Sequence, residues 1–181
     1  MSTLTDTQEL LPTGTWVEDT IHSHVGFEIG YATGTFRGSF SPFVARLTVE
    51  SDGGASLVGE ARADSVHVLD ENLNAHLLSP DFFDVQRAPV LSFVSTEIER
   101  AGDELRVSGD LTLKGVTAPV ELRGTIAPAF PHPAGERFPI KLEGTVDRRD
   151  FGIDWNMELP NGEQALANDV VLTADLFLVK G

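Results

Sequence analysis

The chain has 181 residues, 41% of them hydrophobic and 23% charged, which is typical of one ordinary globular domain. It contains no cysteine, and this excludes disulfides, thiolate metal sites and cysteine nucleophiles. Its net charge of −15 repels phosphate backbones and anionic lipid headgroups, so we expect neither nucleic-acid binding nor direct electrostatic docking on membranes.

The N-terminal segment is polar and has neither a basic start nor an apolar run of signal-peptide length. We expect residues 1–13 to form a polar arm and residues 14–181 to form one β-barrel domain. No stretch is long and apolar enough for a membrane-spanning helix. Together these features predict a cytoplasmic location.

Most of the remaining chain alternates apolar and polar residues with a period of two. Val25, Phe27 and Ile29, for example, are separated by Gly26 and Glu28. Such alternation predicts strands that are buried on one face, as in antiparallel sheets. The same pattern recurs, between turn signals, at 36–40, 47–50, 55–63, 105–113, 120–126, 138–147 and 170–179. We therefore predict an all-β fold, an antiparallel barrel of about eight strands, a number that can enclose one small ligand.

One segment departs from this period. Leu73 and Leu77 are four residues apart, and Ser79-Pro80 follows them. This spacing predicts a short helical segment near 71–84. On a barrel, such a segment can plug one end or cover it as a lid.

Several inward positions are unusually small. They are Ala55, Gly59, Ala61, Ala63, Gly109, Gly124 and Gly144. Strand glycines can relieve crowding where a barrel bends. Small residues can also leave space for a guest in an otherwise close-packed interior. Both explanations stay open at this point.

The aromatic residues are mostly phenylalanine, with 11 Phe against two Trp and one Tyr. A pocket lined by Phe and Leu suits a hydrocarbon chain, with one or two polar groups fixing its headgroup. A solid aromatic core would use the same residues, and aromatic content alone favours that alternative.

We expect structural roles, and no metal-binding or catalytic roles, for the other notable polar residues. His22 and His24 share one strand face, but no third metal ligand follows from the spacing, so no metal is expected. The charged cluster of Asp147, Asp150 and Asp154 with Arg148 and Arg149 predicts a turn or strand end with local ion pairs. We expect no catalytic residue and no cofactor.

Specific motifs occur in order from about Thr15 to Leu178. They are the segments Trp16–Phe27, with its His22-Ser23 pair, Phe36-Arg-Gly-Ser-Phe40, His76–Asp84, Gly109-Asp-Leu-Thr-Leu-Lys-Gly-Val-Thr117 and Arg148–Ile153. With these motifs the sequence resembles the YceI-like family of lipid-binding proteins. Leu78 and Leu69 depart from the family pattern. The match at His22-Ser23 suggests a structural hydrogen-bonding role for this pair.

The resemblance implies a lipocalin-like barrel that binds a polyisoprenoid or related long-chain lipid, such as a quinone-like or fatty-acid-like molecule, for transport, storage or sequestration. Family members often pair, so a homodimer is one expected assembly. Two alternatives remain: a barrel enzyme or stress-linked protein acting on a small lipid-like molecule, and a structural protein with a filled core.

The alternation of inward and outward side chains, together with the motif resemblance, predicts a set of residues that line or close the ligand site. His76 is included because its imidazole can donate a hydrogen bond to a headgroup. The set is Phe27, Ile29, Phe36, Phe40, His76, Phe82, Phe83, Phe93, Leu111, Leu113, Phe138 and Trp155.

Overall fold

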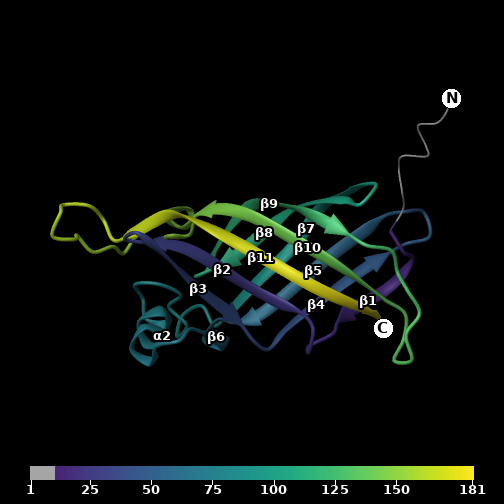
Figure 1. Cartoon of the computed structure of the whole chain (residues 1–181), viewed down its shortest axis with the longest axis horizontal. Coiled ribbons are helices and arrows are strands. Elements are labelled where there is room, and N and C mark those ends of the chain that lie inside the picture. The colour runs from purple at the N-terminus through teal and green to yellow at the C-terminus, as the bar shows by residue number, and fades with distance from the viewer. Residues whose placement is uncertain (1–10) are drawn as a thin grey trace.

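A computed structural model describes residues 11–181, which fold mainly into β-strands (Figure 1). The polar arm predicted over residues 1–13 falls largely outside the described residues. The strands are β1 Gly14–Glu18, β2 His24–Tyr31, β3 Gly34–Phe40, β4 Phe43–Val49, β5 Ala55–Arg62, β6 Val66–His67, β7 Val90–Ala101, β8 Glu104–Leu113, β9 Val116–Ile126, β10 Arg137–Asp147 and β11 Leu166–Lys180. The helical elements are the 3-10 turns η1 Ala63–Ser65 and η2 Arg148–Phe151 and the α-helix α2 Glu71–Leu78.

The strands close into a barrel. β1 pairs with both β4 and β11, and this completes a ring of eight strands in the order β1, β4, β5, β7, β8, β9, β10, β11. Each pairing in the ring is antiparallel. The predicted eight-stranded antiparallel barrel is confirmed.

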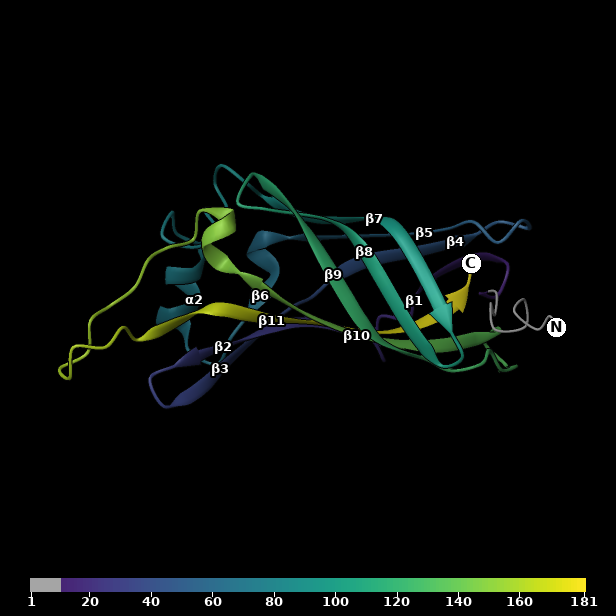
Figure 2. The same cartoon turned by 90° about the horizontal axis from the view of Figure 1, so that it is seen from above.

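The barrel is long because β1 and β2 lie one after the other along the same neighbour, β11. β11 pairs with β1 near its C-terminal end and with β2 along its N-terminal part. On the other side of these two strands, β2 pairs with β3 and β1 pairs with β4. Figures 1 and 2 show β2 and β3 extending the sheet toward the end of the molecule that carries α2, opposite the C-terminus.

The break between β1 and β2 is held by hydrogen bonds from the predicted His-Ser pair. His22 Nδ1 lies 2.9 Å from Asp19 Oδ2, and Ser23 Oγ accepts a 2.9 Å hydrogen bond from the Phe177 amide. The same Asp19 oxygen accepts a 3.1 Å hydrogen bond from the largely buried guanidinium of Arg137. The hydrogen bond with His22 is the main cause of a lowered pKa at Asp19. His22 therefore has the structural role that its motif indicated.

The predicted helical segment is also confirmed. The Asp70 carboxylate caps α2 by accepting hydrogen bonds from the amides of Asn72 and Leu73, at 2.8 and 2.9 Å. The helix ends at Leu78, and turns follow it as far as Phe83. This segment lies across one end of the barrel (Figure 1).

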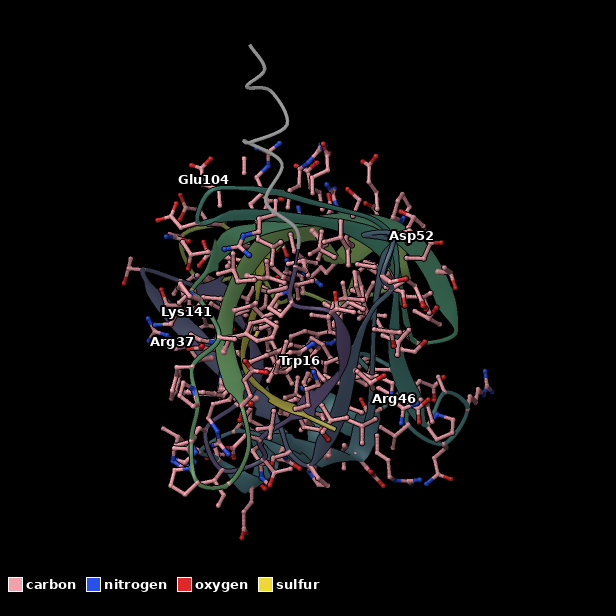
Figure 3. The ribbon with its side chains drawn as sticks, turned by 90° about the vertical axis from the view of Figure 1, so that its right-hand side faces the viewer. Trp16, Arg37, Arg46, Asp52, Glu104 and Lys141 are labelled. Carbon is pink, nitrogen blue, oxygen red and sulfur yellow. The ribbon has the colours of Figure 1, made fainter. Side chains whose placement is uncertain are left out.

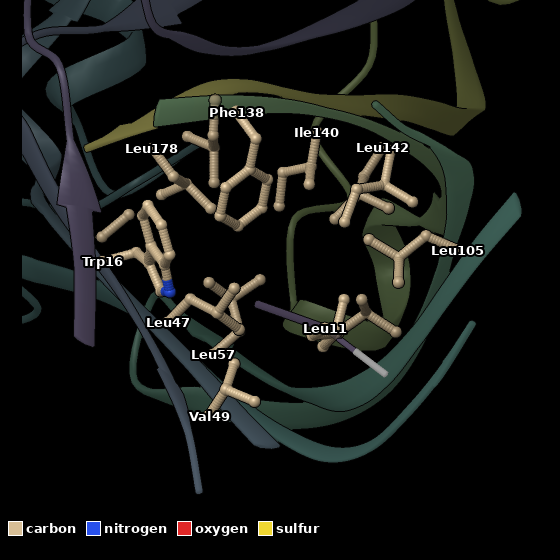
Figure 4. Close-up of a cluster of buried hydrophobic side chains, with 14 of the residues drawn as sticks. Leu11, Trp16, Leu47, Val49, Leu57, Leu105, Phe138, Ile140, Leu142 and Leu178 are labelled. Carbon is tan, nitrogen blue, oxygen red and sulfur yellow. The ribbon is translucent and has the colours of Figure 1, made fainter. Parts of the chain in front are cut away.

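The other end of the barrel is filled with side chains. Trp16 and Phe138 are fully buried there and pack edge to face, with ring centroids 4.7 Å apart. Viewed from this end, Trp16 lies inside the ring of strands while Arg46 and Lys141 lie outside it (Figure 3). Figure 4 shows Leu47, Ile140 and Leu178 gathered around the same interior, and Leu11 packs against this filled core from just before β1.

Backbone crowding explains some of the inward glycines. A methyl group at Gly124 would overlap the backbone carbonyl oxygen of Lys141 on the adjacent strand β10. Gly59 is different, because a methyl group there would meet only the Val44 carbonyl oxygen, at 3.6 Å. The relief of crowding and the provision of space are thus both present, at different positions.

This difference makes a paired test. We expect Gly124→Ala to lower the free energy of unfolding by about 1–3 kcal/mol, because the strand backbones must move apart. We expect Gly59→Ala to change it by no more than about 0.5 kcal/mol. Urea unfolding of both variants beside the parent measures the two values. Equal effects would contradict the assignment of these glycines to different roles.

Candidate ligand cavity

A cavity of about 670 Å³ lies in the part of the barrel that α2 covers, and Leu73, His76 and Leu77 of this helix line it. Its volume lies within the range of about 300–1,000 Å³ that is usual for small-molecule sites. Its wall is almost wholly apolar. The wall includes the exposed residues Tyr31 and Met157, so the cavity reaches the surface beside the β2–β3 hairpin and the segment before β11. We call this opening the mouth.

A group of phenylalanine rings forms one side of the cavity. Phe27 on β2 lies with its ring centroid 6.0 Å from those of Phe36 and Phe40 on β3. It also lies 6.2 Å from Phe83, which in turn is 5.6 Å from Phe40. These contacts join the barrel wall to the segment that follows α2.

Two of the wall phenylalanines need a glycine on the neighbouring strand. A methyl group at Gly38 would approach the Phe27 ring to 2.5 Å, and one at Gly109 would approach the Phe93 ring equally closely. Without Cβ atoms at these positions, each ring lies against the sheet and does not project across the barrel. Glycine thus keeps the interior open by giving room to large residues on the next strand.

The segment from α2 to Asp84 covers the cavity, and we call it the lid. Three of its own residues, Leu77, Phe82 and Phe83, line the cavity and are buried, with at most 9% of their surface exposed. His76 lies between two aromatic rings, with its ring centroid 4.9 Å from Phe82 and 4.6 Å from Trp155. Its Nε2 is 2.9 Å from Asp81 Oδ2. That contact orients the imidazole at the cavity wall.

A buried arginine organises the opposite side of the mouth. Arg148, 4% exposed, donates hydrogen bonds to the carbonyl oxygens of Ala167, Ile153 and Trp155, at 2.9, 3.0 and 2.7 Å. Burial lowers the pKa of this guanidinium from its usual value. These carbonyl groups lie at the beginning and at the end of the segment 153–167, so Arg148 holds the two ends of this segment together and fixes Trp155 within it.

Its neighbour Arg149 forms the ion pair that the sequence predicted. The Arg149 guanidinium lies 2.6 Å from the Asp147 carboxylate and lowers the pKa of that carboxyl to about 2. Arg148 instead bonds to backbone carbonyls. The charge-rich cluster therefore divides into a surface ion pair and a buried support for the mouth.

Lys114 connects the lid to that support. Its Nζ donates hydrogen bonds to the carbonyl oxygens of Pro80 and Gly152, at 2.6 and 3.2 Å. Pro80 belongs to the lid, and Gly152 follows the 3-10 turn that contains Arg148. The tip of the β8–β9 hairpin thereby holds both sides of the mouth together.

The inner end of the cavity is formed by five residues that belong both to its wall and to the filled core. We call them the floor: Ala45, Leu57, Leu122, Leu142 and Leu176. None carries a polar side-chain atom. The ionisable residues along the cavity lie elsewhere: His76 in the lid, Arg148 and Tyr31 at the mouth, and Glu60 on β5. Among residues 11–181, no three His, Asp or Glu side chains are grouped to hold a metal ion.

Eleven of the twelve residues predicted for the ligand site lie on the cavity wall. Phe138 is the exception. Its side chain faces inward as parity predicted, but it is fully buried against Trp16 in the filled end. The alternation along a strand shows whether a side chain points into the barrel, but it does not show how far along the barrel the side chain lies. The sequence reasoning missed Arg148 as part of the wall, and the only signal for it was its place in the Arg148–Ile153 motif.

Comparison with known proteins identifies the same architecture. The model of the YceI-like domain matches residues 16–178. Protein YceI of Escherichia coli O157:H7 is 32% identical over 141 residues, which covers 73% of this chain and 71% of that protein.

Two solved structures share the fold. BcnA of Burkholderia cenocepacia is similar with a TM-score of 0.71 at 23% identity, over 88% of this chain and 98% of that one. A polyisoprenoid binding domain from Saccharophagus degradans is similar with a TM-score of 0.64 at 14% identity, over 94% of this chain and 100% of the domain. No helix within residues 11–181 has the length and apolar character needed to cross a membrane.

The contrast between a filled and a hollow end predicts unequal costs for two Phe truncations. Phe138→Ala should lower the free energy of unfolding by about 3–5 kcal/mol, because it leaves a void among packed side chains. Phe36→Ala should cost no more than about half of that, because one side of its ring already faces open space. Chemical denaturation of the ligand-free proteins compares them. A larger loss for Phe36→Ala would show that the cavity end is packed.

Proposed function

The chain belongs to the YceI-like family, and from that premise we propose that it binds an isoprenoid-like chain inside its barrel for transport, storage or sequestration. The observation that carries the proposal is the apolar cavity of about 670 Å³, closed by a floor at one end and covered by a lid at the other. The solved polyisoprenoid binding domain of the same fold supports this class of ligand.

The distribution of polar groups supports one orientation for the guest. The floor offers only hydrocarbon, so the tail lies there. A hydroxyl, phosphate or quinone-like headgroup lies at the mouth, within reach of His76. The contact with Asp81 holds the imidazole in place, and it leaves Nδ1 as the ring nitrogen for the headgroup.

Affinity in such a site comes from removing apolar surface from water. Each buried methylene contributes about 0.8 kcal/mol, so even a modest prenyl chain offsets the several kcal/mol lost on association. The wall is preformed by rings that already contact one another, which lowers the cost of ordering side chains on binding. Specificity for long apolar molecules follows from the wall, since a buried polar group would find no partner deep in the cavity.

The same distribution favours a binding protein over an enzyme. Chemistry on the guest would require at least two polar groups that converge on one of its atoms. His76 and Asp81 form a close polar pair beside the cavity, but Asp81 is directed to the histidine and does not itself line the cavity. The floor supplies no acid, base or nucleophile.

The two tryptophans allow a direct test. Trp155 lies on the cavity wall, whereas Trp16 is buried in the filled end. Titration with geranylgeraniol should change the tryptophan emission of the parent protein and of Trp16→Phe. Trp155→Phe should retain the ligand, as read by native mass spectrometry, and lose the emission change.

Protein purified gently and extracted with organic solvent should also release a long-chain lipid. Failure to take up any prenol, fatty acid or quinone-like lipid in either experiment would overturn the proposed function.

A further inference from the structure

The cavity ends well before the barrel does. The floor residues Leu57, Leu142 and Leu176 contact both the open space and the filled core. Behind them Trp16, Phe138 and Leu178 have no exposed surface, and none of the three lines the cavity. Only part of the barrel's interior is therefore available to a guest.

Packed side chains close the inner end of the cavity. Trp16 Nε1 donates a 2.9 Å hydrogen bond to the Pro12 carbonyl oxygen, and the Lys180 ammonium lies 5.1 Å from the indole ring centroid. These contacts fix the largest side chain of the filled end. Leu11, 8% exposed, packs into the same core from beyond the strands. A tail that reaches the floor thus meets a close-packed barrier.

The volume converts into a chain length. A water-sized group occupies about 30 Å³ in a liquid, so a cavity of about 670 Å³ holds roughly 22 non-hydrogen atoms. An isoprene unit has five carbons, and about four units account for that number. Further units would extend through the mouth, where they stay in water and add no burial.

We propose that the floor makes this protein selective for isoprenoid chains of about four units, and that longer chains gain no affinity because their extra units remain outside. This inference rests on the proposed function and specifies the length of its ligand. Gly59 is the position that best controls it. Gly59 pairs with Ala45 of the floor and with Phe93, the wall residue that packs against both the filled core and the lid end.

A side chain at Gly59 can enter the cavity without displacing backbone, since an added Cβ meets only the Val44 carbonyl oxygen, at 3.6 Å. A leucine there raises the floor by about the size of one isoprene unit. The matched control is Val94→Leu, on the outer face of the adjacent strand β7, where the side chain is 52% exposed and does not line the cavity.

The experiment is a competition among neutral prenols of two, three, four and nine isoprene units, with the bound species read by native mass spectrometry. In the parent, affinity should rise at least about tenfold with each unit up to four. The nine-unit prenol should bind no better than the four-unit one. Comparison of variants on one mixture cancels the different solubilities of the prenols.

Gly59→Leu should lower the preference for the four-unit over the three-unit prenol by about tenfold, and Val94→Leu should leave it unchanged. Gly59→Ala, which adds one methyl group, should shift the preference in the same direction by a smaller factor and serves if Gly59→Leu does not fold. Affinity that keeps rising to nine units, or an equal preference in parent and Gly59 variants, would overturn the length limit while leaving the proposed function in place. Uptake of no prenol at all would instead overturn the proposed function.

Discussion

The constraint on which this structure depends is the fixed width of a closed eight-stranded ring. Strand pairing sets the distance across the barrel, so the interior can be filled or left hollow only by changing the volume of inward side chains. At one end Trp16, Phe138 and Leu178 fill it. Toward the other end the inward positions of β5 are Gly59 and Ala61, and space remains. One continuous barrel thereby contains both a stable core and a binding site.

The hollow end needs support that a packed core would otherwise provide. Polar contacts at its edge supply it. Arg148 binds carbonyl oxygens along residues 153–167, and Lys114 links that region to the lid through Pro80 and Gly152. A buried guanidinium is costly to desolvate, so its hydrogen bonds to several carbonyl groups are what make the position tolerable. The cation has no ion-pair partner within 4 Å among the described residues, and it acts by fixing backbone at the mouth.

Much of this could be predicted from the sequence, and the reasons are local. Alternation in 24–31 or 105–113 indicates which side chains face inward, and about eight such strands is a number that favours ring closure. The spacing of Leu73 and Leu77 gave the helix of the lid. The depth of a side chain along the barrel is a different quantity, because it depends on the stagger between paired strands such as β10 and β11, and the period-two pattern does not reveal that stagger. Phe138 and Phe93 both face inward, and only the pairing of their strands places Phe138 in the filled end and Phe93 on the cavity wall.

The roles of the inward glycines also could not be predicted fully from the sequence. Their sequence positions allowed two explanations, relief of crowding and space for a guest, and the structure adds a cause that combines them. Gly38 and Gly109 each lie beside the ring of a phenylalanine on the adjacent strand, and the missing Cβ lets that ring lie flat against the sheet. The hollow is therefore a property of cross-strand pairs, in which a large residue and the smallest one are matched. A single mutation to alanine at such a pair would push a ring toward the centre of the cavity, so the space for the guest and the packing of its wall are encoded by the same pairs of residues.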